Sequence, residues 1–301
     1  MDLKVGRYIV GVTNQNKLLF PKAGISKIDL IEYYLAMAEH IIPYTKDRPV
    51  TMHRFPDGIG GKSFYQKEAS DYFPDWLDTV KVPKEDGEIE MVMINKKASL
   101  TYLANQGCIT PHIWLSKKDK IDYPDKLVFD LDPSDNDFNV VIQAAKDFRK
   151  LLEDELDLKT FIMTTGSKGL HIIVPIIRNK NFDEVREFAS GVCKIIANDK
   201  PDDYTTEIRK DKRKGRLFLD YMRNSYAQTS VMPYAVRALE GAPVATPLFW
   251  KELQGKMNAQ RYTLSNIQKR IENEENPWEN YYKSRKSLSK PMQILEKMLN
   301  R

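Results

Sequence analysis

Cysteine is nearly absent from this sequence of 301 residues, which contains only Cys108 and Cys193. Two cysteines so far apart exclude a disulfide framework and a cysteine-rich zinc cluster. The sequence also lacks an apolar run long enough to cross a bilayer, and it lacks the charged and then apolar leader of a secreted protein. We therefore expect a cytoplasmic protein with no membrane partner.

A strong charge imbalance, internal repeats and low-complexity linkers are absent as well. With 42% hydrophobic and 30% charged residues, the chain has the composition of an ordinary globular protein with a sizeable core. The formal net charge of +5 permits a nucleic-acid partner without requiring one. The distribution of charge is therefore more informative than its total, and the most basic run is residues 209–216.

A buried strand is predicted at residues 126–132, because the run is apolar and rich in β-branched and aromatic types until Pro133 ends it. The pleat of a strand points Asp130 and Asp132 to one side and the apolar residues beside them to the other. Two carboxylates about 4 Å apart repel each other by roughly 4 kcal/mol at an effective dielectric near 20. A divalent cation reverses this sign, so the pair indicates a metal site. A strand that runs out into a solvated acidic turn is the alternative.

Residues 164–171 form a turn rich in hydroxyl groups and glycine between two predicted strands. Such a turn offers backbone amides, hydroxyls and the Lys168 cation to a phosphate chain, although a tight polar hairpin is the alternative. It is not a Walker loop, because no helix follows the lysine. The basic run leads into another predicted strand at 217–221, where Asp220 could complete a metal site of three aspartates.

A helix is predicted to begin at Ser26, which forms a capping box with Asp29, and to end at Pro43, because apolar residues recur at helical spacing between them. Lys27 then lies in the first turn, where the helix dipole favours anions and disfavours a cation. Together with Lys17 and the free backbone amides, it predicts a phosphate site. A solvated lysine at a helix end is the alternative.

Two adjacent aromatic residues, Phe64 and Tyr65, follow a glycine-rich turn and are flanked by lysines. In a strand they must face opposite ways, so at most one of them can lie in the core, and its neighbour is free to stack on a base. A core residue beside a half-exposed tyrosine is the alternative.

The remaining predicted elements follow ordinary patterns. They are strands at 8–12, 161–163 and 172–176, a hairpin at 80–93, helices at 97–106, 138–155 and 182–197, extended segments at 109–114 and 232–237, and a polar helical tail at 265–301 anchored by Trp278.

These motifs together resemble the polymerase domain of the bacterial non-homologous end-joining ligase, ligase D, within the archaeo-eukaryotic primase superfamily. The resemblance extends from Asn14 to Pro247 and is looser in the tail. Its motifs are specific in combination: Asp-Leu-Asp-Pro at 130–133, Thr-Gly-Ser-Lys-Gly-Leu-His at 165–171, Leu-Asp-Tyr at 219–221, Asn224, and Tyr234-x-x-Arg237.

The resemblance implies a role for each matching residue. Two catalytic divalent ions, Mn²⁺ in preference to Mg²⁺, would be bound by Asp130, Asp132 and Asp220. An aromatic pair, Phe64 and Tyr65, would stack on the nucleotide base or the templating strand. Six polar residues would grip the triphosphate: His112, Thr165, Lys168, His171, Arg213 and Arg237. A pocket for the downstream 5′-phosphate of a gap would consist of Asn14, Lys17 and Lys27.

Four residues depart from the family pattern. Thr165 stands where a serine is usual, and Ala235 replaces a serine beside the predicted triphosphate arginine. Tyr65 replaces a second phenylalanine, and His53 stands where a lysine is common. No metal ligand is lost, so these departures bear on sugar selectivity and affinity.

The resemblance implies an α/β (α+β) protein with the archaeo-eukaryotic primase fold, in which an RRM-like antiparallel catalytic sheet packs beside a smaller α/β lobe. Residues 1–301 would form a single primase-polymerase domain. Within it we expect an N-terminal lobe with the phosphate pocket at about 1–120, a catalytic lobe at about 121–264 and a helical tail at about 265–301.

The implied function is a template-directed primase-polymerase that fills short gaps at DNA double-strand breaks, with a preference for ribonucleotides. Its substrates would be gapped or overhanging DNA with a 5′-phosphate, together with NTPs or dNTPs. A Lys-x-Asp-Gly tetrapeptide, the pattern of a ligase nucleophile, occurs only at residues 84–87, in the turn of the hairpin predicted at 80–93, and the resemblance covers no ligase domain. We therefore expect a nucleoid-associated protein that works with a separate DNA ligase and a Ku-like end-binding protein.

Two other function classes remain open. A metal-dependent glycosyltransferase needs one Asp-x-Asp pair and neither Asp220 nor the basic run. A non-catalytic DNA-end binding module explains Lys17, Lys27 and the basic run, but it does not explain three aspartates beside them.

Overall fold

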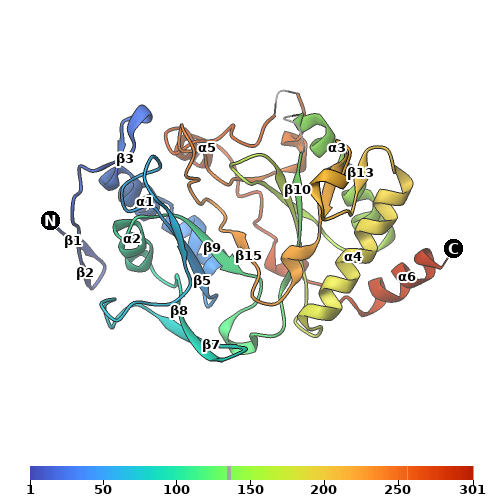
Figure 1. The fold of residues 1–301 in the computed structure, drawn as a ribbon, viewed down its shortest axis with the longest axis horizontal. Helices are drawn as coiled ribbons and strands as arrows, with labels where there is room; N and C mark the ends of the chain where they lie inside the picture. Colours follow the sequence, from blue (N-terminus) through green and yellow to red (C-terminus); the bar gives the residue numbers. More distant parts are fainter. Residues whose placement is uncertain (134–136, 256, 301) are drawn as a thin grey trace. The chain divides into compact units, whose positions relative to one another are not determined.

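The computed structural model describes residues 1–133, 137–255 and 257–300, and it divides into two compact units (Figure 1). Unit 1 comprises residues 1–119, 229–245 and 262–274, and unit 2 comprises 120–228, 246–261 and 275–301. The chain therefore passes between the units several times. Residues 134–136 and 256 of the predicted catalytic lobe, and residue 301 of the predicted tail, lie outside the described residues.

Unit 2 contains a sheet of six strands in the order β13-β14-β10-β12-β11-β16. Every pair of neighbours is antiparallel except β13 and β14. The strands are β10 (Lys126–Asp132), β11 (Phe161–Thr164), β12 (Leu170–Pro175), β13 (Tyr204–Thr205), β14 (Leu217–Asp220) and β16 (Pro247–Leu248), and the two helices between them are α3 (Phe138–Arg149) and α4 (Phe182–Asp199).

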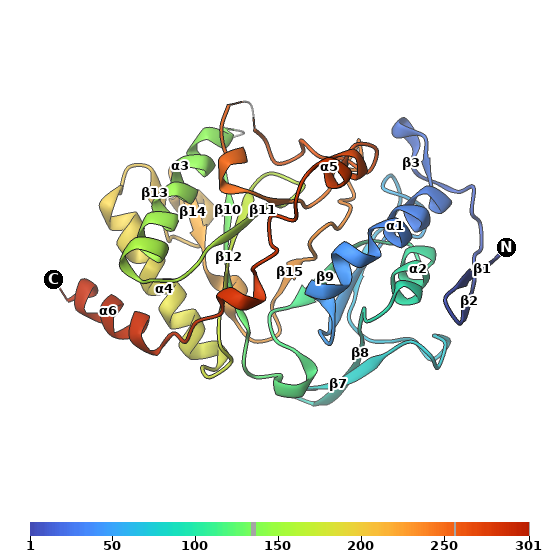
Figure 2. The same ribbon diagram turned by 180° about the vertical axis from the view of Figure 1, so that it is seen from behind.

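The four central strands confirm the predicted RRM-like sheet. In chain order the elements run β10, α3, β11, β12, α4 and β14, which is the β-α-β-β-α-β sequence of ferredoxin-like folds. Their spatial order is β14-β10-β12-β11, with all three pairings antiparallel. Figure 2 shows α3 and α4, which both contact β10. One face of the sheet is therefore covered by helices.

The alternation of residues along β10 assigns its two faces. Phe129 and Leu131 are fully buried, and the Phe129 ring lies 4.8 Å from the ring of Phe148 on α3. Because neighbouring residues of a strand point to opposite faces, Asp130 and Asp132 belong to the face away from α3. The buried apolar face thus holds the two carboxylates on the other side of the sheet.

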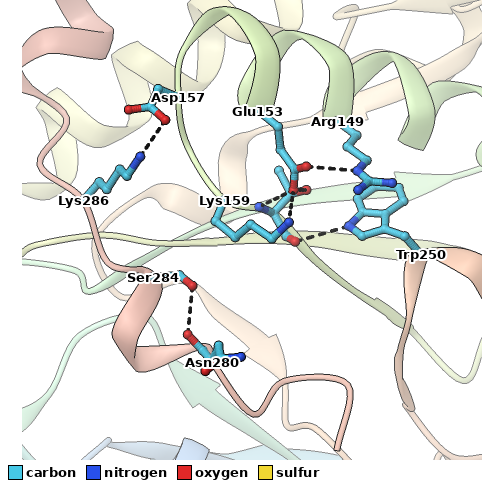
Figure 3. A network of polar contacts seen from close by, with 9 residues as sticks. Arg149, Glu153, Asp157, Lys159, Trp250, Asn280, Ser284 and Lys286 are labelled. Carbon is cyan, nitrogen blue, oxygen red and sulfur yellow. Dashed lines mark hydrogen bonds and ion pairs between the residues drawn. The ribbon is translucent and has the colours of Figure 1, made fainter.

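The helix predicted at 138–155 has an irregular end. Helix α3 stops at Arg149, and Lys150–Glu155 (η3) continues as a π-helix. Figure 3 shows the contacts that hold this end: Glu153 accepts hydrogen bonds from the Thr160 amide at 3.0 Å and the Thr160 hydroxyl at 2.7 Å, and it pairs with Arg149 at 3.1 Å. The Trp250 indole donates to the Thr160 carbonyl at 3.2 Å. These long-range contacts override the local helical pattern.

Unit 1 contains a four-stranded antiparallel sheet, three hairpins and three helices. The sheet has the order β15-β9-β5-β6, with β5 (Val50–Arg54), β6 (Phe64–Gln66), β9 (Cys108–Trp114) and β15 (Thr229–Val231). The hairpins are β1 (Asp2–Val5) with β2 (Tyr8–Gly11), β3 (Leu18–Phe20) with β4 (Ile25–Ser26), and β7 (Thr79–Lys84) with β8 (Gly87–Val92), and the helices are α1 (Lys27–Thr45), α2 (Lys97–Asn105) and α5 (Ile267–Asn273).

The predicted end of α1 at Pro43 is wrong, because the helix contains Pro43 and continues to Thr45. A proline inside a helix removes one hydrogen bond and crowds the preceding turn. Here tertiary contacts hold the last turn: the Thr45 hydroxyl donates to the Ile94 carbonyl at 2.9 Å, and the Arg48 guanidinium donates to the Tyr44 carbonyl at 3.0 Å. The predicted start is confirmed, since Ser26 and Asp29 form a capping box.

The prediction of an extended segment at 232–237 is also wrong. Strand β15 ends at Val231, and the chain then turns, with the Ala235 amide donating to the Met232 carbonyl at 3.0 Å. Tyr234 adopts a left-handed conformation with φ of 63°, and its carbonyl accepts a hydrogen bond from the Tyr33 hydroxyl at 2.8 Å. The buried hydrogen bond from α1 thus fixes a turn that the local sequence pattern did not predict.

The predicted tail contains α5 in unit 1 and α6 (Ser289–Leu299) in unit 2. Trp278 is buried and its indole donates to the Ile162 carbonyl of β11 at 3.1 Å, which confirms it as an anchor. No helix of the described residues is long and apolar enough to cross a membrane. Short 3₁₀ turns complete the chain at η1 (Pro21–Ala23), η2 (Lys118–Lys120), η4 (Lys210–Lys212), η5 (Met222–Asn224), η6 (Trp250–Glu252) and η7 (Tyr282–Ser284).

Candidate functional site

Three predicted site residues lie side by side across the sheet of unit 2. In the register of the strands, Asp130 of β10 is opposite His171 of β12 on one side and opposite Asp220 of β14 on the other. Residues directly opposite in an antiparallel pair share a face, with Cβ atoms about 5 Å apart. The register therefore brings these side chains together on the face opposite the helices, with Asp132 two residues further along β10.

Asp130 is buried and strongly paired. Its Oδ2 accepts a hydrogen bond from Arg223 Nε at 3.1 Å and forms an ion pair with Arg223 Nη2 at 3.1 Å. Burial alone would raise the pKa of Asp130, but the charges of His171 and Arg223 outweigh burial and hold the pKa well below its usual range. The His171 Nε2 lies 3.4 Å from Asp130 Oδ1, but the two atoms do not form a hydrogen bond. Oδ1 therefore has no hydrogen-bond partner among the described residues.

Asp220 differs from Asp130 in its electrostatics. Burial raises its pKa, and the negative charge of Asp130 raises it further, while the Met222 amide that donates to Asp220 Oδ1 at 2.7 Å opposes the rise. The two carboxylates therefore repel each other, as expected for a pair that shares one face. A cation beside them would relieve this repulsion.

These carboxylates line a cavity of about 460 Å³ together with basic side chains. Among these, the Arg213 guanidinium lies 3.9 Å from the centre of the Phe218 ring. Negative and positive side chains facing one cavity suit a metal-bound polyphosphate. The charged lining residues are Asp130, Asp132 and Asp220 together with Lys168, Lys210, Arg213, Arg216 and Arg223.

The three aspartates of the cavity are chemically suited to bind a divalent cation, although they do not surround a single point. No group of three or more His, Cys, Asp or Glu side chains converges on one point in the described part of the chain. Carboxylate oxygens are ligands that Mn²⁺ and Mg²⁺ prefer. The Asp130 Oδ1 is buried without a hydrogen bond, although buried polar atoms normally have one. These two observations make the carboxylates of the cavity the place where the residues fit such an ion.

The turn between β11 and β12 is built by Thr165, which is buried. Its hydroxyl accepts hydrogen bonds from the Ser167 amide at 3.3 Å and the Gly169 amide at 3.1 Å. Gly169 has no room for a side chain, because a Cβ there would overlap the Leu131 carbonyl and the Asp132 carboxylate. Thr165 and Gly169 thus shape the turn, and Lys168 is exposed at the cavity.

The sequence analysis missed Arg223 and did not explain Asn224. The buried Asn224 side chain accepts from the Val128 amide at 2.9 Å and donates to the Val128 carbonyl at 2.8 Å, so it pairs with β10 as a strand would. This contact positions η5, and Arg223 within it, beside Asp130. The signal for Arg223 was its place three residues after Asp220, next to a charge that needs a counter-ion.

Four predicted nucleotide residues belong to unit 1, and three of them group around His53. The Tyr65 ring stacks on His53, with centroids 4.0 Å apart and planes at 12°, and it lies 5.8 Å from the His112 ring. Burial lowers the pKa of His53, and the positive charge of Arg237 lowers it further. The fold therefore brings Tyr65, His112 and Arg237 together around a histidine that stands where a lysine was expected.

Phe64 lies on the other side of β6, and neither member of the aromatic pair is in the core. Phe64 is 46% exposed and Tyr65 is 61% exposed. Strand β6 is the edge of its sheet and only three residues long, so neither of its faces is covered. Phe64 is opposite Arg54 of β5, whose guanidinium carbon lies 5.4 Å from its ring centre.

The three predicted phosphate residues also lie together in unit 1. The Lys17 amide donates to the Asn14 carbonyl at 3.0 Å, and the Lys27 amide donates to the Lys17 carbonyl at 2.8 Å. The Lys17 ammonium pairs with Asp57 at 2.9 Å, whereas the Lys27 ammonium has no hydrogen bond or ion pair within the described residues. Lys27 is only 6% exposed, and burial, followed by the charges of Lys17 and Arg54, lowers its pKa.

The predicted site residues thus fall into groups in both units. Unit 2 brings the three aspartates into one cavity with Lys168 and Arg213, and His171 beside Asp130. Unit 1 groups Tyr65, His112 and Arg237, and separately Asn14, Lys17 and Lys27, while Phe64 lies on the opposite face of β6.

Comparison with known proteins gives consistent matches. The family model described as "LigD, primase-polymerase domain" matches residues 26–278. The chain is similar to the multifunctional non-homologous end joining protein LigD of Pseudomonas aeruginosa, with 31% identity over 286 residues that cover 94% of this chain and 34% of that protein. It is 30% identical over 274 residues to the bifunctional LigD of Bacillus subtilis, covering 90% of this chain and 44% of that protein.

A solved structure is also similar. The polymerase domain of Mycobacterium tuberculosis ligase D, in complex with DNA, matches with a TM-score of 0.85 and 28% identity over 90% of this chain and 97% of that chain. The chain therefore corresponds to nearly all of that domain but spans less than half the length of the curated relatives it matches.

Proposed function

We propose that this chain, which belongs to the LigD primase-polymerase domain family, is a template-directed primase-polymerase that fills short gaps at DNA double-strand breaks in non-homologous end joining. The observation that carries the proposal is the cavity of unit 2. It combines three carboxylates with five basic side chains, in a volume of about 460 Å³. This is the chemistry needed to hold a nucleoside triphosphate and its metal ions beside a primer end.

Asp130, Asp132 and Asp220 would hold two divalent ions, Mn²⁺ or Mg²⁺. When bound, such ions lower the pKa of a primer 3′-hydroxyl and neutralise the triphosphate. The unsatisfied Asp130 Oδ1 and the repulsion between Asp130 and Asp220 support this assignment. Arg223, which pairs with Asp130 Oδ2, orients that carboxylate and balances its charge.

The triphosphate would be bound by basic residues of the cavity. Lys168 and Arg213, which line the cavity, would neutralise its oxygens, and Arg213 is held by its own hydrogen bonds to the carbonyls of Glu207 at 3.0 Å and Ile208 at 2.7 Å. The buried Thr165 keeps the turn that presents Lys168 in shape. His171 would act from the strand beside Asp130.

In unit 1, the Tyr65 ring that stacks on His53 would stack on a nucleotide base or on the templating strand. His112 and Arg237, which lie near this pair, would bind triphosphate oxygens, as the family resemblance implies. A stacking surface accepts any base, which suits template-directed synthesis. The family resemblance implies that ribonucleotides would be preferred over deoxyribonucleotides.

The pocket of Asn14, Lys17 and Lys27 would bind the 5′-phosphate on the far side of a gap. A buried ammonium without a partner at the first turn of α1 is favourable only when an anion is brought to it. A separate DNA ligase and a Ku-like end-binding protein would complete the repair, and the DNA substrate would place the protein at the nucleoid.

Primer extension tests the proposal. Purified protein with Mn²⁺, a gapped duplex carrying a 5′-phosphate and nucleotides should extend the primer across the gap. The double variant Asp130→Ala and Asp132→Ala should lose at least about a thousandfold in rate, because it removes two carboxylate ligands. Lys46→Ala, a change at an exposed lysine after α1, is the control.

Other outcomes would favour the alternatives. Normal extension by the double aspartate variant would exclude the metal assignment. DNA binding by the wild-type protein without extension under any divalent ion would indicate a DNA-end binding module, and turnover of a nucleotide sugar in the absence of DNA would indicate a glycosyltransferase.

A further inference from the structure

An exposed aromatic pair in unit 1 has no role in the proposed chemistry so far. Tyr72 is 62% exposed and Phe64 is 46% exposed, and both contact the side chain of Arg54. Large aromatic side chains left in water forgo the stabilisation of burial, so a group of them indicates a binding surface. We call Phe64, Arg54 and Tyr72 together the platform.

Arg54 is rigidly held in this platform by neutral partners. Its Nε donates to the Gln106 carbonyl at 2.8 Å, its Nη1 donates to Gln66 Oε1 at 2.7 Å and to the Tyr72 hydroxyl at 3.2 Å, and its Nη2 donates to Gln106 Oε1 at 3.3 Å. No carboxylate of the described residues pairs with it. The guanidinium therefore presents an uncompensated positive charge in a fixed plane, which suits both stacking and an anionic partner.

The register of β6 separates this platform from the predicted nucleotide site. Phe64 is opposite Arg54, whereas Tyr65 is opposite His53, so the two aromatic residues serve opposite faces of the same strand. A single nucleotide stacked on Tyr65 cannot also contact Phe64. The platform must therefore take a different base.

The position of Arg54 indicates which base this is. Burial lowers the pKa of Lys27, and the charges of Lys17 and Arg54 lower it further. The platform therefore lies within electrostatic range of the phosphate pocket. The chain also links them directly, since residues 55–57 follow Arg54 and the Lys17 ammonium donates to the Pro56 carbonyl at 3.0 Å. A base that stacks on the platform would be attached to a phosphate bound at Lys27.

We propose that Tyr72, with Phe64 and Arg54, stacks the nucleobase that carries the 5′-phosphate at the downstream edge of a gap. The inference rests on the proposed function, because it requires a gapped DNA substrate. It adds Tyr72 and Arg54 as binding residues, and it separates the tasks of Phe64 and Tyr65. Stacking of this kind tolerates any base, so the platform would recognise the strand end without reading its sequence.

The test compares DNA binding by wild-type protein, Tyr72→Ala and Tyr72→Phe, measured by fluorescence anisotropy. The probe is a gapped duplex with a 5′-phosphate, and a second probe is identical except for an abasic site at the phosphorylated nucleotide. Tyr72→Ala should bind the first probe about tenfold more weakly, because one base stack is lost. On the abasic probe it should bind as the wild type does, and Tyr72→Phe, which keeps the ring, should stay within about twofold of the wild type on both.

A matched control is Ile9→Ala, which removes another exposed apolar side chain of unit 1, 65% exposed on β2. It should leave the affinity for both probes unchanged. Because Tyr72 is so exposed, Tyr72→Ala should also retain the thermal unfolding midpoint of the wild type.

Two results would overturn the assignment. One is an equal loss of affinity for both probes in Tyr72→Ala, and the other is a loss that disappears only when the opposing template base is made abasic. If the wild type extends primers but Tyr72→Ala binds all duplexes normally, the platform is wrong and the polymerase function stands. If the wild type neither binds nor extends gapped DNA, both proposals fail.

Discussion

The cavity of unit 2 and the phosphate pocket of unit 1 gather charge in opposite ways. In the cavity, Asp130 is paired with Arg223 at 3.1 Å, and acidic and basic side chains together form the lining. In the pocket, the charges of Lys17 and Arg54 act on a buried Lys27 that has the same sign, and its pKa is lowered. The cavity thus gives Asp130 a counter-ion, whereas Lys27 of the proposed pocket has no carboxylate partner among the described residues.

This difference predicts opposite responses to mutation. Removing a charge from the cavity should destabilise the fold, because a buried partner remains uncompensated. Removing a charge from the pocket should leave the fold intact or improve it, because a desolvated like charge disappears. The two regions therefore separate stability from binding.

The largest effect is expected where the cavity has no room to adapt. Gly169→Ala would drive a Cβ into the Leu131 carbonyl and the Asp132 carboxylate, so β10 must shift. We expect a loss of about 3 kcal/mol in the free energy of unfolding, measured by urea denaturation, and a strong loss of primer extension. Gly60→Ala, where an added Cβ meets no heavy atom within 4 Å, is the control and should change neither quantity. A stable and active Gly169→Ala protein would contradict this geometry.

A smaller effect is expected from Arg223→Met, which leaves Asp130 without its counter-ion. Because Arg223 is 40% exposed, solvent screens part of the loss, and we expect about 2 kcal/mol at pH 7. The folded-state pKa of Asp130 is lowered, so its contribution is present above the unfolded pKa and is lost as the pH falls towards the folded value. The difference from the wild type should therefore narrow below about pH 4.

Urea denaturation at a series of pH values measures this difference directly. Arg209→Met, a change at an exposed arginine of the basic run, should show no comparable dependence on pH. A destabilisation by Arg223→Met that stays constant through the acid range would mean that Arg223 acts by packing rather than by charge.

The smallest effect on stability, and the opposite sign, is expected in the pocket. Lys27→Met keeps the apolar stem and removes the buried charge, so the free energy of unfolding should rise by up to about 1 kcal/mol. Affinity for a gapped duplex with a 5′-phosphate should fall about tenfold, with little change for the same duplex without it. Lys22→Met, at an exposed lysine of η1, is the control. Equal losses on both duplexes would mean that Lys27 does not recognise the phosphate.

Local patterns predicted the elements well where the chain itself carries the information. The capping box of Ser26 and Asp29 starts α1, and the alternation of β10 buries Phe129 while Asp130 faces the other way. Predictions failed where distant residues decide. Pro43 stays helical because Thr45 bonds to Ile94, and residues 232–237 turn because the Tyr33 hydroxyl donates to the Tyr234 carbonyl.

The sequence by itself determined the central strands and helices of unit 2, the start of α1, and the kinds of side chain at each candidate site. Periodicity and capping act over a few residues, so they can be recognised without the fold. Only the tertiary structure decided that Asp130 lies opposite both Asp220 and His171 and is paired with Arg223, and that Arg54 acts on Lys27. Strand register and burial set those contacts, and both depend on how segments far apart in the chain pack together.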